Sequence, residues 1–154
     1  MKKFTILLML IVTSASYAQL KKLEKTADTS VEIGKVQPLG QPVQIDCQKD
    51  GNVYTFTYTD IAFKQLTQYR KFSFEDIDNT FETLYSTIIA GYEAKKEDSI
   101  NLELPEYFLT LKFEKSFGML LLRIRSLDRK GAGQITESNL FTKKQIEKLF
   151  GKKK

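Results

Sequence analysis

An alternation of apolar and polar residues on both sides of Asp50-Gly51 constrains the fold more than any other feature of this chain. Residues 43–47 and 53–59 alternate between the two faces of an extended chain, with the larger apolar residues on one face. This period of two is typical of a strand with one buried face. Asp-Gly between two such runs is a strong hairpin signal, because a type I′ turn needs positive φ at both central residues. A turn centred there predicts three pairs on one buried face: Cys47 opposite Tyr54, Ile45 opposite Phe56 and Val43 opposite Tyr58.

The same period returns in the second half of the chain. A turn at Pro105-Glu106 pairs residues 100–104 with residues 107–113, so that Leu102 faces Leu109 and Ile100 faces Leu111. A second turn at residues 116–118 leads into a strand over 119–125. Beyond the Gly-rich loop 128–133, residues 134–140 predict an edge strand.

Two helices are expected between and after these strands. Ser73 and Asp76 have the spacing of a capping box and predict a helix over residues 74–93. Its apolar face contains Ile77, Phe81, Leu84, Ile88 and Tyr92. A second capping box, Thr142 with Gln145, opens a short helix that Gly151 closes.

These elements predict an α+β fold of the order β-β-(β)-α-β-β-β-(β)-α, where residues 68–72 add a short strand. A meandering antiparallel sheet in two hairpin-rich halves, with the helices packed on one face, buries both the strand faces and the helix stripe. We expect a flexible leader over residues 19–42, one domain over 43–151 and a basic tail over 152–154.

Residues 1–18 have the features of a cleavable secretory signal peptide. Lys2 and Lys3 precede an unbroken apolar run over residues 4–12, and Ser16 and Ala18 are the small residues that a signal peptidase requires. The run is about half the ~20 residues of a membrane-spanning helix. We therefore expect a mature chain that begins at Gln19 without a transmembrane segment and is periplasmic or secreted.

The formal net charge of +5 does not indicate a nucleic-acid-binding surface. Once Lys2 and Lys3 are set aside, together with the six lysines and one glutamate of residues 143–154, residues 19–142 hold 16 basic and 18 acidic residues. The positive charge therefore belongs to the C-terminal tail, which is either a solvated end or an attraction for an anionic envelope component. No nucleic-acid partner is expected.

The chain contains no histidine and one cysteine. The absence of histidine excludes Ser-His-Asp, Cys-His and histidine-ligated zinc sites, and a single cysteine forms no internal disulfide. Cys47, on the apolar face of the first hairpin, is interpreted as a buried core residue. The acids at 75, 76 and 78 suit a helix start, and the loop 130–133 lacks the Walker spacing. No catalytic residue, metal ligand or cofactor is predicted.

One strand pair departs from the expected pattern of an apolar face and a polar face. Alternation over residues 107–125 places apolar residues on the face where water is expected, and two arginines follow them along the strand. Either the second helix covers that end or the face is a partner surface. The candidate surface comprises Phe108, Lys112, Met119, Leu121, Arg123 and Arg125.

We therefore expect an exported, non-enzymatic binding protein of the bacterial envelope. Its partner would be a protein, a peptide or an anionic envelope component, bound through the sheet face. One alternative is an inhibitor or immunity-type protein of a partner enzyme. Another is a small histidine-free hydrolase or lyase that uses carboxylates, which would bring acids or tyrosines together in one pocket.

Overall fold

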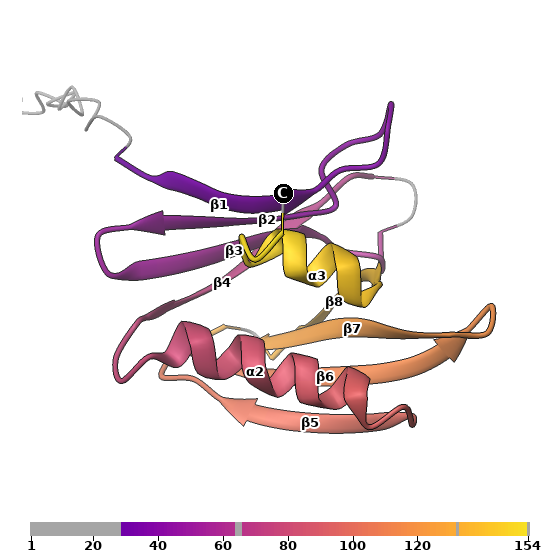
Figure 1. Ribbon diagram of the computed structural model, residues 1–154. Coiled ribbons are helices and arrows are strands. Elements are labelled where there is room, and N and C mark those ends of the chain that lie inside the picture. The colour runs from indigo at the N-terminus through magenta and orange to yellow at the C-terminus, as the bar shows by residue number, and fades with distance from the viewer. Residues whose placement is uncertain (1–28, 64–65, 132, 154) are drawn as a thin grey trace, which may run out of the picture.

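The computed structural model describes residues 29–63, 66–131 and 133–153, and in that part of the chain forms two four-stranded antiparallel sheets and two helices (Figure 1). The first half comprises β1 (Val31–Val36), β2 (Ile45–Asp50), β3 (Val53–Thr59), β4 (Tyr69–Glu75) and α2 (Thr80–Glu93). The second half comprises β5 (Asp98–Glu103), β6 (Tyr107–Ser116), β7 (Met119–Asp128), β8 (Ile135–Phe141) and α3 (Lys143–Leu149). The predicted α+β class and antiparallel meander are confirmed.

The predicted signal peptide lies outside the described residues. Among those that are described, no helix is long and apolar enough to cross a membrane.

The first hairpin forms on the predicted face but in a different register. Ile45 pairs with Tyr58, Cys47 with Phe56 and Asp50 with Val53. The two turn residues are therefore Gly51 and Asn52, not Asp50 and Gly51, and every pair moves by two positions. Gly51, with φ of +56°, is the turn's first central residue, where a type II′ turn requires positive φ. A shift of two keeps each side chain on its face, which is why the apolar pattern did not reveal it.

The hairpin of β5 and β6 has the predicted register, with Leu102 opposite Leu109 and Ile100 opposite Leu111. Strands β4 and β8 also form close to their expected positions.

Strand β1 lies within the segment predicted to be a flexible leader, so ordered structure begins before Val43. A β-bulge between Glu32 and Gly34 shifts its pairing with β2 and interrupts the period of two. The alternation that identifies a strand is therefore missing from this stretch of sequence.

Helix α2 begins at Thr80, six residues later than predicted. Ser73 and Glu75 extend β4 instead, and the Ser73–Asp76 capping box does not form. Asp78 and Asn79 both have left-handed φ, of +53° and +60°, so the helix cannot extend backwards through them. The Asp76 carboxylate accepts a hydrogen bond from the Phe81 N–H at 2.9 Å, and Ile77, expected on the buried face, is 56% exposed.

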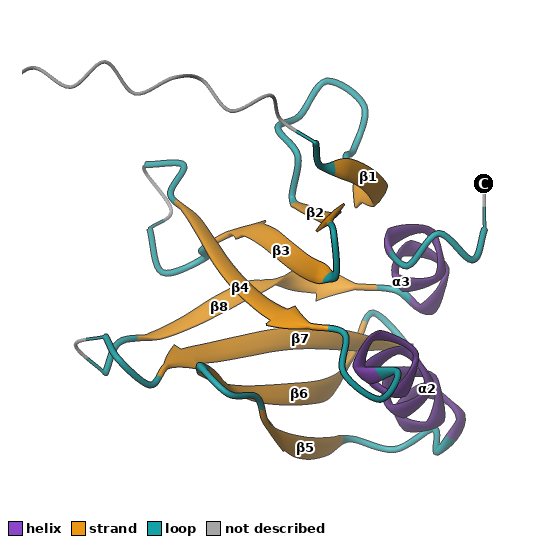
Figure 2. Cartoon of the chain, turned by 90° about the vertical axis from the view of Figure 1, so that its left-hand side faces the viewer, coloured by secondary structure: helices purple, strands orange, loops and turns teal. Residues whose placement is uncertain are grey.

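One core joins the two halves, because both helices lie on the same side of the sheets (Figure 2). Helix α2 reaches the second sheet, where Gly91 allows the Phe113 ring of β6 to approach. Helix α3 returns to the first sheet, where a Cβ on Gly34 would lie 2.2 Å from the Lys148 carbonyl oxygen. Each helix therefore packs against the sheet of the other half.

Helix α3 begins and ends as predicted. Thr142 and Gln145 form the capping box, and Gly151 has φ of +68° after the last turn. The expected basic tail is not wholly free, because the Lys152 ammonium lies 2.5 Å from the Glu82 carboxylate on α2. It also lies 5.3 Å from the centre of the Tyr85 ring.

Candidate functional site

The six predicted surface residues share one face of the second sheet, here called its outer face, which is turned away from the core. Lys112 pairs with Arg123, and Thr110 pairs with Arg125. The residues that alternate with them on β6, Leu109, Leu111 and Phe113, are at most 1% exposed. The prediction of a shared face therefore holds, and neither helix covers Phe108, which is 41% exposed.

The six residues do not form one patch. Phe108 pairs with Leu127 and Met119 with Ser116, so the two ends are eight residue steps apart along β7, about 26 Å at ~3.3 Å per step. Leu121 is only 8% exposed and contributes little to any surface. Met119 and Leu121 therefore have to be removed from the predicted partner surface.

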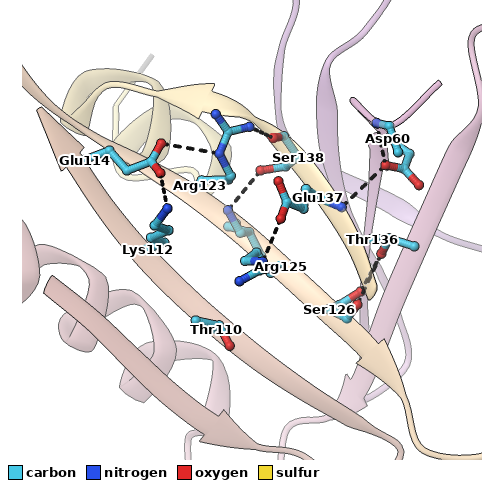
Figure 3. A network of polar contacts seen from close by, with 12 residues as sticks. Asp60, Thr110, Lys112, Glu114, Arg123, Arg125, Ser126, Thr136, Glu137 and Ser138 are labelled. Atoms are coloured by element: carbon cyan, nitrogen blue, oxygen red, sulfur yellow. Dashed lines mark hydrogen bonds and ion pairs between the residues drawn. The ribbon is translucent and has the colours of Figure 1, made fainter. Parts of the chain in front are cut away.

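The middle of the outer face is a network of ion pairs (Figure 3). The Glu114 carboxylate lies 2.5 Å from Lys112 Nζ and 3.4 Å from Arg123 Nε. Arg123 Nη1 also donates to the Ser138 carbonyl oxygen at 2.9 Å. The hydrogen bond from Lys112, together with the Arg123 charge, lowers the pKa of Glu114. Lys112 and Arg123 are thus already paired within the chain.

Arg125 is held differently. Its Nε lies 2.7 Å from Glu137 Oε1, but the carboxylate lies off the N–H direction. Figure 3 draws this ion pair as a dashed line. The buried Nε therefore donates no properly directed hydrogen bond within the described residues. The side chain is 36% exposed, so its guanidinium retains capacity for a partner.

At the end of the sheet opposite Met119, the apolar residues of this face lie in one row. The pairing places Glu103, Phe108, Leu127 and Ile135 side by side on β5, β6, β7 and β8. Phe108 and Ile135 are 41% and 51% exposed, and Leu127 between them is half-buried. We call Phe108, Leu127 and Ile135 the apolar row.

Two arginines border the apolar row. The Arg129 guanidinium lies over the Phe108 ring at 4.8 Å from its centre, and Arg125 lies beside the row on β7. A small hollow of about 110 Å³ lies among Phe108, Arg125, Leu127 and Ile135. Sequence reasoning missed Leu127, Arg129 and Ile135. If the alternation is extended past Arg125, it places Leu127 on the outer face. The position of Ile135 beside Leu127 depends on how β8 pairs with β7, which the sequence does not reveal.

A second hollow, here called the β4 cavity, lies between β4 and the ends of β6, β7 and β8. Its volume is about 350 Å³, and its lining includes Arg70, Lys71, Tyr107, Ser126, Asp128 and Thr136. Beneath it the buried Tyr58 hydroxyl lies 2.6 Å from Ser126 Oγ and 2.5 Å from Thr136 Oγ1. This hydroxyl cluster links the two sheets.

The β4 cavity brings Tyr69, Tyr107 and Asp128 together, which is the kind of grouping expected of a carboxylate- or tyrosine-based enzyme. Burial, followed by the charges of Asp128 and Glu106, raises the pKa of Tyr107. At neutral pH this phenol is protonated and can donate a hydrogen bond.

The remaining candidates have structural explanations. Cys47 is fully buried, and burial followed by the Asp46 charge raises the pKa of its thiol to about 12. Asp76 caps α2. Across residues 29–63, 66–131 and 133–153, no three Cys, Asp or Glu side chains gather in a way that could hold a metal ion.

Comparison of the chain with protein-family models, with curated proteins and with solved structures found no match.

Proposed function

We propose that this protein is an exported, non-enzymatic binding module that holds a protein partner on the apolar row. The observation that carries the proposal is that Phe108 and Ile135 remain 41% and 51% exposed in a continuous row that crosses the sheet. Exposed apolar residues that adjoin one another, bordered by polar groups, are typical of surfaces that another molecule covers.

The neighbours of the apolar row support a protein partner. Aromatic residues and arginine are enriched at the centres of protein interfaces, and here an arginine lies on each side of the row. Covering the exposed parts of Phe108 and Ile135 would contribute on the order of 2 kcal/mol from apolar burial. Arg125 adds donors that no residue of the described chain uses in a directed hydrogen bond.

Export is the second part of the proposal and rests on residues 1–18. N-terminal sequencing of the protein from the envelope or the medium should give Gln19 as the first residue. An intact Met1 in that material would contradict a cleaved signal peptide.

Affinity capture with the mature chain as bait tests the binding surface. A Phe108→Ser, Ile135→Ser double variant should retain at least tenfold less of the protein that the wild type retains. Phe117→Asn is the matched control, because Phe117 is a 95% exposed aromatic in the β6–β7 turn, at the opposite end of the strands. Thermal unfolding of each bait verifies that it is folded. Equal retention by the wild type and the folded double variant would overturn the proposed surface.

A further inference from the structure

Two hydrogen bonds, one at each end of β4, show which backbone groups of this strand point towards β3 and which point away from it. Asp60 N–H donates to the Gln68 carbonyl, and Asp76 N–H donates to the Asn52 carbonyl. Both pairs continue the β3–β4 register, so the even-numbered residues of β4 bond to β3. The N–H and C=O groups of Tyr69 and Lys71 therefore point to the opposite, free edge. No hydrogen bond within the described residues uses them.

The other sheet edges are less suited to pairing with an added acidic strand. β1 carries a bulge and meets the last turn of α3 at Gly34. The β8 edge is partly paired, because Ile61 N–H donates to the Glu137 carbonyl at 3.0 Å. β5 begins and ends with the acidic residues Asp98 and Glu103. Among the described strands, β4 combines unpaired backbone groups with basic side chains.

The β4 cavity opens along this same edge, since Tyr69, Arg70 and Lys71 all line it. The Arg70 Nε lies 3.5 Å from the Asp60 carboxylate, and its Nη2 lies 3.4 Å from the side-chain oxygens of Gln68 and Gln134. These contacts are long for hydrogen bonds, and Nη1 donates to no residue of the described chain.

The residues that line the β4 cavity include two cations, Arg70 and Lys71, and one carboxylate, Asp128. Arg70 is ion-paired with the buried Asp60 carboxylate at 3.5 Å, whereas Lys71 forms no ion pair within the described residues, so the Lys71 ammonium remains available. Asp128, on the opposite wall, already accepts hydrogen bonds from the N–H groups of Lys130 and Gly131. A carboxylate in the cavity would therefore meet the unpaired Lys71 ammonium, with the Arg70 guanidinium beside it.

We propose that β4 binds an extended acidic peptide, which adds as a fifth strand to the first sheet at Tyr69–Lys71 and places a carboxylate in the β4 cavity. In this recognition mode, main-chain hydrogen bonds supply affinity and a side-chain pocket supplies specificity. The site ends near Ser73, which lies beside Tyr107 of β6. The basic pair Arg70 and Lys71 opposes pairing with the same edge of a second copy. An acidic partner is favoured for the same reason.

The test uses synthetic heptapeptides of alternating Val and Thr, titrated into the mature ¹⁵N-labelled protein. The first has a central Glu and both ends blocked. The second has Gln in place of Glu, and the third is this Gln peptide with a free C-terminal carboxylate. The fourth is the Glu peptide with methylated nitrogens on both sides of the Glu. The readouts are amide shifts and the hydrogen exchange of the Tyr69 and Lys71 amides.

The Glu peptide should slow exchange at Tyr69 and Lys71, and the blocked Gln peptide should bind roughly tenfold more weakly. Recovery of binding by the free carboxylate would identify a peptide C-terminus as the natural source of the charge, within the same proposal. The methylated peptide should not bind, because it cannot pair with the edge. Equal binding of the methylated peptide, or no binding of either carboxylate peptide at about 1 mM, would overturn the proposal.

Variants of Lys71 separate the backbone from the charge. Lys71→Pro removes the outward N–H without breaking the β3–β4 ladder, whereas Lys71→Ala removes only the side chain. Lys71→Pro should bind the Glu peptide up to about tenfold more weakly than Lys71→Ala, the effect of one backbone hydrogen bond. Asn101→Pro makes the same change at an outward position of the β5 edge and should leave binding intact. Equal binding by the two folded Lys71 variants, or equal loss in Asn101→Pro, would refute strand addition at β4.

Discussion

At the scale of single residues, two buried phenols connect the protein's stability to pH. Burial raises the pKa of both Tyr58 and Tyr92, and the Tyr92 hydroxyl donates to the Phe141 carbonyl at 2.7 Å. Above pH ~10 the unfolded chain loses these protons while the folded chain keeps them. The free energy of unfolding should therefore be unaffected by these groups below pH 10 and fall as the pH rises beyond it.

Urea unfolding at pH 8 and pH 11 measures this effect. The wild type should lose more stability between the two values than Tyr92→Phe, which has no phenol to titrate at that position. An equal loss in both proteins would show that Tyr92 is not buried as described.

The β6–β7 turn contains a residue that does not suit its backbone. Phe117 has φ of +51°, next to Gly118 with φ of +75°, and its side chain is 95% exposed. Asn-Gly is the preferred pair for such a turn, and a bulky residue in the left-handed region is strained. Phe117→Asn should raise the free energy of unfolding by about 0.5–1 kcal/mol in urea titrations. A decrease would mean that Phe117 makes a stabilising contact.

Cys47 should be unreactive in the folded state. It is fully buried and its pKa is raised to about 12, so neither access nor thiolate is present at neutral pH. Labelling with a maleimide should be slow in buffer and fast in denaturant. Rapid labelling in buffer would contradict its burial on β2, between β1 and β3.

At the scale of elements, β1 is held to α3 by an approach that only glycine permits. A Cβ on Gly34 would meet the carbonyl oxygens of Lys148 at 2.2 Å and of Leu149 at 2.7 Å. Gly34→Ala should therefore cost about 2–3 kcal/mol, because backbone rather than a flexible side chain has to move. Lys35→Ala, which removes an exposed ion pair with Glu32, is the control and should change stability little. Equal unfolding midpoints for the two variants would refute this packing.

Elements with an uninterrupted period were predicted from sequence, and their buried faces were assigned correctly except at Ile77, which precedes α2 and is exposed. The failures have local causes. A two-residue slip of the first hairpin preserves every face, so only the turn geometry at Gly51 distinguishes the registers. The bulge in β1 removes its period, and the pairing of Ser73 with Thr55 on β3 overrides a capping pattern that favours an earlier helix. None of these features is visible in the apolar pattern alone.

At the scale of the whole molecule, neither half is complete without the other. The Phe150 ring, beyond α3, lies 5.3 Å from Phe56 on β3 and 4.9 Å from Phe81 on α2. A fragment of residues 29–97 therefore lacks the helix that completes the core of its own sheet. It should show no cooperative thermal unfolding by circular dichroism, whereas a chain of residues 29–153 should. A cooperative transition in the short fragment would establish two independent domains.

The candidate surface was predictable only in part, because it depends on contacts between strands that are distant in the sequence. Residues of one predicted strand pair, such as Phe108 and Arg125, were assigned to the correct face. The apolar row also needs Ile135, which reaches it only after β8 pairs with β7 beyond a register shift. The β4 cavity combines residues from both sheets, and no local pattern in the chain predicts how the two sheets meet.

Oxidative footprinting of the captured complex tests whether a protein partner covers the apolar row. Hydroxyl radicals modify exposed apolar side chains, and this protein carries several at separate places, including Phe108, Ile135, Phe117 and Met119. Mass spectrometry should show that the partner protects Phe108 and Ile135 while Phe117 and Met119 are modified as in the free protein. Unchanged modification of Phe108 and Ile135 in a complex that protects other residues would contradict the account.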